Sequence, residues 1–189
     1  MAEVIKKELP EKELKKLEHD LFFTEGMSIK LSMEHYGKFQ SKLKSVIHND
    51  AKTLSKKYLN KIINFKAIKD GFTIKILDDY LIQKILDYWG DPESREILSL
   101  LMDAELTAPE ILSKVNIAKT SAYRKLENMV IDGIIIETKK VLSESKKVSK
   151  HRCIFDQINI KFGPGSISVT CNVSKNLFNN STIAKNIFP

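Results

Sequence analysis

The sequence has few of the residues that build a metal or catalytic centre. Its only cysteines are Cys153 and Cys171, too few for a disulfide framework. No histidine pairs with a cysteine at the usual zinc-ligand spacing, and the histidines are dispersed along the chain: His19, His35, His48 and His151. We therefore expect no metal site, and a buried free thiol at each cysteine.

Glycine and long apolar runs are also scarce. The seven glycines stand singly, and the chain has neither a glycine-rich phosphate loop nor a Gly-x-Ser-x-Gly motif. We expect no enzyme and no cofactor. No apolar run approaches the ~20 residues that a membrane span needs. The first twenty residues are charged throughout, unlike a signal peptide. The sequence thus predicts a cytoplasmic protein with no membrane partner.

Charge is present, and it is unevenly distributed. The chain carries a formal net charge of +7. Between Asp91 and Ser113 there are six acids and one base, a net of −5. From Lys114 to Arg152 there are ten bases and four acids, a net of +6. A reversal of sign within one short stretch is typical of a domain that turns one face toward phosphates.

The first part of the chain predicts a helical arm, residues 1–26. Leu14, Leu17 and Leu21 recur at helical spacing after Pro10, which indicates a helix over Pro10–Phe23. This helix is either a dimer arm or a helix packed on the body of the protein.

Residues 27–90 predict a small α+β domain for sensing or dimerisation. Alternation in Met27–Ser32 indicates a strand, and a second strand, Phe72–Leu77, follows an Asp70-Gly71 turn. Two helices with one apolar face each lie between them, giving a β-α-α-β order. Their apolar residues are Tyr36, Phe39, Leu43, Val46 and Ile47, then Leu54, Tyr58, Leu59, Ile62 and Ile63, with Asn49 or Asp50 as the cap of the second helix.

Lysine is concentrated in these two helices and the turn after them. Between Tyr36 and Asp70 nine lysines face only two acids, Asp50 and Asp70. Two interpretations stay open: a solvated face of amphipathic helices, or an auxiliary surface for DNA flanks or an acidic ligand. The lysines are Lys38, Lys42, Lys44, Lys52, Lys56, Lys57, Lys61, Lys66 and Lys69.

The apolar spacing predicts a helix over Tyr80–Tyr88, and Gly90 stops it. Asp91-Pro92 then begins the next helix, which runs to about Met102. We place a domain boundary here. Another helix begins at Thr107, where Thr107-Ala-Pro-Glu110 has the sequence of a capping box. The short link Asn116-Ile117-Ala118 then forms a turn, with Ile117 as an apolar plug.

The third helix, Thr120–Asp132, has two distinct sides. Ala122, Leu126, Met129 and Val130 form the apolar side. Hydroxyl, guanidinium, ammonium and amide groups on the other side can contact phosphates and base edges in a major groove. The candidate DNA-binding residues of this helix are Thr120, Ser121, Tyr123, Arg124, Lys125 and Asn128.

A basic hairpin follows. Gly133 ends the helix, Ile134–Leu142 predicts a strand, Ser143–Lys150 a polar turn and His151–Phe155 a second strand. Helix, capped helix, turn, polar-faced helix and basic hairpin is the order of a winged helix-turn-helix. The candidate phosphate-contacting residues are Lys119, Lys139, Lys146, Lys147, Lys150 and Arg152.

The stretch GDPESREILSLLMDAELTAPEILSKVNIAKTSAYRKLENMVIDGIIIE resembles the winged-helix domain of ArsR-like transcription regulators, especially archaeal ones. The winged-helix domain that the resemblance implies, 91–155, covers about a third of the chain. It implies Thr120–Asp132 as recognition helix, Ile134–Phe155 as wing, and a homodimer. Metal-sensing members carry paired cysteines in the helix-turn-helix. Asp91–Asp132 has none, so metal sensing is not implied.

Residues 156–189 predict a β-hairpin and a tail. Ile158, Ile160 and Phe162 alternate before a Gly163-Pro164-Gly165 turn, and apolar residues alternate again after it. The hairpin either extends the sheet of the wing or packs against the strands that precede residue 91. The asparagine-rich tail offers four residues that can dock on the body: Leu177, Phe178, Ile187 and Phe188.

The sequence thus predicts an α+β protein of four segments, 1–26, 27–90, 91–155 (the winged helix-turn-helix) and 156–189. Its expected function is sequence-specific binding of double-stranded DNA as a homodimeric transcription regulator, with an unknown effector as a further partner of the N-terminal domain. The alternative is a winged-helix protein–protein interaction module in a transcription or chromatin complex. The dimer surface stays open among Pro10–Phe23, Tyr80–Tyr88 and the C-terminal hairpin.

Overall fold

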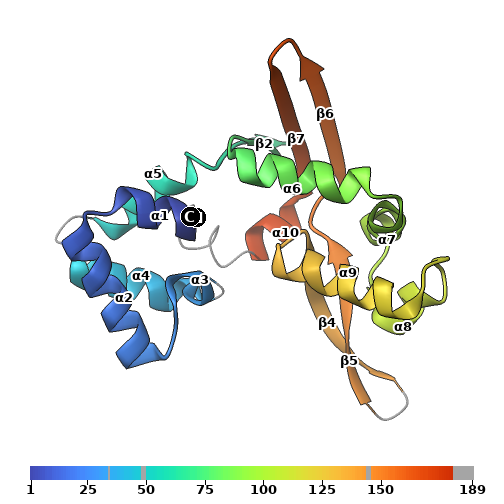
Figure 1. Ribbon diagram of the computed structural model, residues 1–189, viewed down its shortest axis with the longest axis horizontal. Coiled ribbons are helices and arrows are strands. Elements are labelled where there is room, and N and C mark those ends of the chain that lie inside the picture. The colour runs from blue at the N-terminus through green and yellow to red at the C-terminus, as the bar shows by residue number, and fades with distance from the viewer. Residues whose placement is uncertain (34, 48–49, 144–145, 181–189) are drawn as a thin grey trace. The chain divides into compact units, whose positions relative to one another are not determined.

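The computed structural model describes residues 1–33, 35–47, 50–143 and 146–180. Within them the chain forms ten helices and two antiparallel sheets, which confirms a mixed α+β fold (Figure 1). Contacts divide the chain into two compact units. The N-terminal unit comprises Met1–Phe65 with the segment from Lys175, and the central unit comprises Lys66–Ser174. The division differs from the four expected segments, whose independence as domains stays a prediction.

The N-terminal unit is mostly helical. Its helices are α1 (Ala2–Glu8), α2 (Glu11–Glu25), α3 (Ile29–Ser32), α4 (Tyr36–Val46), α5 (Ala51–Leu59) and α10 (Lys175–Asn180). The expected apolar spacing of α2 and α4 is confirmed, since Leu17 and Leu21 are fully buried with Tyr36, Phe39 and Leu43 in one core. Residues of the two helices that the sequence placed on apolar faces thus hold this unit together.

One expected strand of this unit is wrong. Met27–Ser32 does not pair with another strand; Ile29–Ser32 forms the short helix α3. The Ser28 hydroxyl accepts a hydrogen bond from the Leu31 backbone N–H at 3.2 Å and so caps a helical turn. The helix buries Ile29 and leaves Leu31 exposed, whereas strand alternation would put both on one face.

A strand that the sequence did not reveal follows α5. The cap at Asp50 is confirmed, but α5 ends at Leu59, and Ile63 begins strand β1 (Ile63–Ile68) instead of continuing the helix. The Asp70-Gly71 turn leads from β1 to β2 (Gly71–Ile76), which the sequence did predict. The order of elements is therefore helices followed by a β-hairpin, not β-α-α-β.

The larger sheet has the order β1-β2-β7-β6. Its C-terminal strands are β6 (Gln157–Gly163) and β7 (Ser166–Ser174), the expected hairpin around Gly163-Pro164-Gly165. The turn needs a residue with positive φ, and Gly165 supplies it at +69°. Because β7 pairs with β2, the hairpin joins the earlier strands and does not extend the other sheet.

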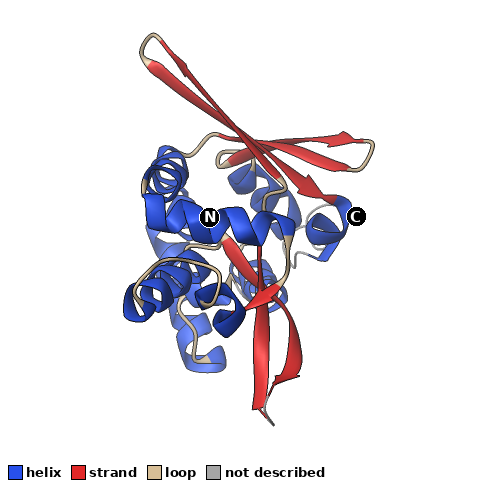
Figure 2. Cartoon of the chain, turned by 90° about the vertical axis from the view of Figure 1, so that its right-hand side faces the viewer, coloured by secondary structure: helices blue, strands red, loops and turns tan. Residues whose placement is uncertain are grey.

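The rest of the central unit contains α6 (Asp79–Gly90), α7 (Pro92–Asp103), β3 (Leu106–Thr107), α8 (Ala108–Leu112), α9 (Lys119–Ile131), β4 (Ile135–Ser143) and β5 (Lys146–Cys153). The smaller sheet has the order β3-β5-β4. Its long β4–β5 hairpin is at the bottom of the view in Figure 2. The expected polar turn Ser143–Lys150 is wrong, because its second half belongs to β5 and pairs with β4.

The capping box at the start of α8 is confirmed. The Thr107 backbone N–H donates to Glu110 Oε2 at 2.7 Å, and the Glu110 backbone N–H donates to Thr107 Oγ1 at 3.4 Å. The bonds that the Thr107 backbone N–H and the Thr107 hydroxyl donate to the Glu110 carboxylate hold the pKa of Glu110 below its usual value. They also fix the point where β3 ends and α8 begins, since Thr107 is the last residue of β3 and the N-cap of α8.

We predict that Thr107→Ala lowers the free energy of unfolding by about 1 kcal/mol, the usual cost of a lost helix N-cap. Thr107→Ser keeps the hydroxyl and is expected to recover most of the loss. Urea denaturation followed by circular dichroism measures both. Thr120→Ala, at an exposed hydroxyl in the first turn of α9, is the control. An equal loss in both alanine variants would contradict a specific role of the cap.

Candidate nucleic-acid interface

Helix α9 is held by one side and exposed on the other. It packs against α7, α8 and β4. Ala122, Leu126 and Met129 are buried, as their spacing predicted, and Val130 is half-buried. In the preceding turn Ile117 is half-buried between exposed neighbours, and its role as an apolar plug stays a prediction. The buried side fixes the helix in the unit, so its exposed side is a surface of defined shape.

The exposed side of α9 carries most of the predicted groove-facing residues. Thr120, Arg124 and Asn128 are exposed, and Tyr123 is 49% exposed. Among the described residues none of these four side chains has a hydrogen-bond or ion-pair partner. Their polar groups are therefore free to bind a ligand without first breaking an internal contact.

Lys125 does not lie on this exposed side of α9 but against the acids at the start of α7. Its ammonium group is 2.5 Å from an Asp91 carboxylate oxygen and 3.4 Å from Glu93, and its side chain is only 20% exposed. Ser121, one turn earlier, donates to Glu93 at 3.1 Å. The sequence predicted both residues on the groove-facing side, but the acids at the start of α7 already bind them.

Asp91 is the centre of this cluster. Its carboxylate caps α7 by accepting from the Ser94 backbone N–H at 2.9 Å, and it also accepts from the Ser94 hydroxyl. The hydrogen bond from Lys125 and then those from Ser94 lower the pKa of Asp91 to about 2. The same carboxylate raises the pKa of Lys125. One side chain thus joins the start of α7 to the middle of α9.

The β4–β5 hairpin carries five of the six cations that were predicted to contact phosphate, and several of them are engaged. Lys139 forms an ion pair with Glu105 at 3.0 Å, and Lys150 donates to the Glu105 backbone oxygen at 3.1 Å. Arg152 pairs with Asp156 at 3.0 Å. These contacts neutralise or fix three of the six cations that the sequence assigned to phosphate.

The remaining cations are Lys119 and Lys147, both exposed and without a partner among the described residues; the side chain of Lys146 lies outside them. Sequence reasoning missed Lys140, which is exposed and equally unpartnered in that part of the chain. Lys140 pairs in register with Ser149, and Leu142 with Lys147. Because alternate residues share a face of a strand, Lys140 and Lys147 project from one face of the hairpin. This shared face depends on the register of β4 with β5, which the sequence did not predict, so no local signal singled out Lys140.

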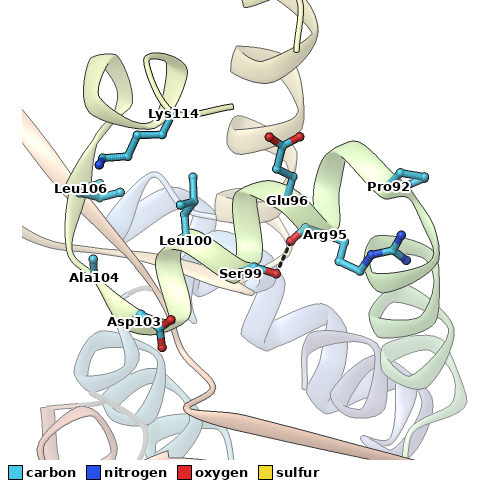
Figure 3. Close-up of a pocket in the computed structure, with 9 residues that line it drawn as sticks. All are labelled: Pro92, Arg95, Glu96, Ser99, Leu100, Asp103, Ala104, Leu106 and Lys114. Carbon is cyan, nitrogen blue, oxygen red and sulfur yellow. Dashed lines mark hydrogen bonds between the residues drawn. The ribbon is translucent and has the colours of Figure 1, made fainter. Parts of the chain in front are cut away.

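A groove of about 670 Å³ runs along the outer side of α7 (Figure 3). Arg95 and Glu96 on its wall already bind backbone groups, the Trp89 oxygen and the Asn116 N–H. Asp103 and Lys114 have no partner among the described residues, and their opposite charges define no class of ligand. The groove is lined by Pro92, Arg95, Glu96, Ser99, Leu100, Asp103, Ala104, Leu106 and Lys114.

Both cysteines are free and buried, as expected. Burial raises the pKa of Cys153 to about 11 and that of Cys171 to about 12, so both remain protonated thiols. Within the described ranges no three His, Cys, Asp or Glu side chains gather as metal ligands would. None of the helices in those ranges combines the length and hydrophobicity that crossing a bilayer requires.

Comparison of the chain with protein-family models, with curated proteins and with solved structures gives no match in any of the three. The geometry of the central unit is therefore the basis for any assignment of function.

We predict that Asp91→Asn, which keeps a helix cap but removes the charge opposite Lys125, lowers the free energy of unfolding at pH 7. We expect about 1 kcal/mol, because solvent screens a carboxylate that is 36% exposed. The pKa of Asp91 is lowered on folding, so its contribution is present above pH 4 and is lost as the pH falls toward about 2.

Chemical denaturation from pH 7 to pH 2 measures this effect. Glu127→Gln, which removes an exposed carboxylate of α9 with no partner among the described residues, is the control. If the deficit of Asp91→Asn persisted unchanged at pH 2, the ion pair would not be its source.

Proposed function

We propose that this protein is a sequence-specific, double-stranded DNA-binding transcription regulator. In this proposal the central unit contains a winged helix-turn-helix: α7, α8 and α9 are its helices and β3, β5 and β4 its sheet. The observation that carries the proposal is the exposed side of α9, where Tyr123, Arg124 and Asn128 stand without internal partners on a helix fixed by its buried side. An α-helix of this kind fits a major groove.

Charge supports the same function. Lys119 and Arg124 on α9, and Lys140 and Lys147 on the β4–β5 hairpin, are exposed and without a partner among the described residues. Each can neutralise a phosphate. Lys125 and Ser121 act differently in this proposal: they position α9 through Asp91 and Glu93 and make no base contact. The homodimer that the sequence resemblance implies belongs to the same proposal.

A second candidate is a protein–protein interaction module. Tyr123 and Ile131 on α9 are 49% and 60% exposed, and exposed apolar side chains of this size are common in protein interfaces. DNA binding is favoured because the same surface also carries unpartnered cations. The N-terminal unit as a site for an effector stays a prediction. So does DNA contact by its lysines, of which Lys38, Lys42 and Lys61 form ion pairs with acids of that unit.

We predict that Arg124→Ala reduces discrimination between duplexes. If Arg124 contacts a base, the loss is ~1–3 kcal/mol on the preferred sequence and much less on random DNA. Selection of bound duplexes from a random pool, followed by fluorescence anisotropy over a salt series, measures it. Lys75→Ala removes an exposed cation of β2 and is the matched control. Absence of binding by the unmodified protein at low salt would reject DNA recognition and favour the second candidate.

We predict that Lys147→Ala weakens binding to all duplexes alike. A phosphate contact carries no sequence information, so its loss lowers the slope of log affinity against log salt by ~1 without changing the preferred sequence. The same anisotropy series provides the slope. A change of sequence preference in this variant would instead place Lys147 at a base edge.

A further inference from the structure

Strand β6 is a free edge. The sheet order β1-β2-β7-β6 places β6 at one end, and no other strand of the described chain pairs with its outer side. Figures 1 and 2 show β6 and β7 as a long hairpin whose turn lies away from the rest of the central unit. An edge strand presents unpaired N–H and C=O groups that can pair with another chain.

This edge has little protection. Proteins usually guard an edge with charges, proline or β-bulges. Strand β6 has neither proline nor a shift in its register with β7, and Lys161 is the one charged residue between Gln157 and Ser174. The chain as a whole has 29% charged residues, so this segment is unusually neutral. It offers few charged side chains for ion pairs with an acidic or basic partner strand. The edge is suited to a neutral strand.

The apolar face of the sheet also continues onto the free part of the hairpin. Ile160 lies opposite Val169 and Phe162 opposite Ile167, so these four share one face. Val169 is fully buried, but Phe162 is 75% and Ile167 41% exposed. The apolar face therefore extends beyond the part of the sheet that the chain itself covers.

We propose that β6 pairs antiparallel with β6 of a second copy of this chain, about a two-fold axis at Ile160. The two four-stranded sheets then form one continuous sheet. This rests on the homodimer in the proposed function and names its surface. The strand Gln157–Gly163 has Ile160 as its middle residue, so this axis pairs its whole length. A closed pair of this kind leaves no further β6 edge for continued growth.

The chemistry of the strand selects this register. With the axis at Ile160, Phe162 lies opposite the partner's Ile158, and Lys161 opposite the partner's Asn159. An axis at Lys161 would oppose two like charges, and an axis at Asn159 would set Phe162 against the partner's Asp156. A shift that changes the side-chain parity would set apolar residues against polar ones.

The test is the oligomeric state of the full chain without DNA, by sedimentation equilibrium over a concentration series. The unmodified protein is expected to be a dimer. Ile160→Lys places two lysines opposite each other and is expected to raise the dimer dissociation constant about 100-fold or more. Ser168→Lys adds the same charge on the polar face of β7 and is expected to leave the dimer intact. A monomeric unmodified protein, or an Ile160→Lys variant that dimerises normally, would overturn the proposal.

Cross-linking tests the register and does not depend on Ile160→Lys folding. Ile160→Cys sets two thiols directly opposite each other and is expected to form an intermolecular disulfide. Phe162→Cys sets its thiols about 13 Å apart along the strands, too far for one. Cys153 and Cys171 are buried and contribute no background. A disulfide at residue 162 but not at 160 would overturn the register. Because no DNA is present, these results are independent of whether the protein binds DNA.

Discussion

The arrangement of the central unit depends on the carboxylate of Asp91. Asp91 is the C-cap of α6, where its backbone N–H donates to the Asp87 oxygen, and it is also the N-cap of α7. The Asp91 carboxylate also forms an ion pair with Lys125 in α9. A residue shared by two helices fixes the bend between them, and the ion pair fixes α9 against that bend. The exposed side of α9 has a defined direction because of these contacts together with the burial of Ala122 and Leu126.

The same cluster changes what the reversal of charge means. From the sequence, the acids after Asp91 and the bases after Lys114 looked like two separate faces. In the structure some of these acids and bases pair with each other inside the unit: Lys125 forms an ion pair with Asp91, and Lys139 forms one with Glu105. The cations of that stretch that remain unpartnered among the described residues are fewer. Apart from Lys114, which lines the groove along α7, they lie on α9 and the β4–β5 hairpin. The positive surface is therefore narrower than the net charge of that stretch indicates.

The helices of the central unit were predictable because their signals are local. A cap at Asp91, a capping box at Thr107 and the spacing of Ala122, Leu126 and Met129 each lie within a turn or two of chain. The errors occurred where local signals were ambiguous. Met27–Ser32 has too few residues to separate period 2 from a helical turn, and the Ser28 cap decides between them. The polar start of β5 resembles a loop, yet it pairs with β4, where Val148 lies opposite Val141.

The side of α9 on which Lys125 lies could not be predicted for a different reason. Helical spacing separates a buried side from an exposed one, but residues at the border depend on what the neighbouring helix presents. Ser121 and Lys125 are one turn apart at that border and face Glu93. The distant pairing of β2 with β7 was left open for the same reason, because apolar alternation defines a face and does not define a partner strand.

The free edge of β6 shows both what local sequence signals predict and what they leave open. Alternation predicted the hairpin, and only the sheet order shows that one of its strands lacks a neighbour. A regulator that reads DNA through α9 gains from a second copy, since two recognition helices double the sequence that is read and fix its spacing. An interface on β6, a strand that carries none of the unpartnered cations assigned to phosphate, leaves α9 and the β4–β5 hairpin free for DNA. Dimerisation and DNA binding would then use separate surfaces of the same unit.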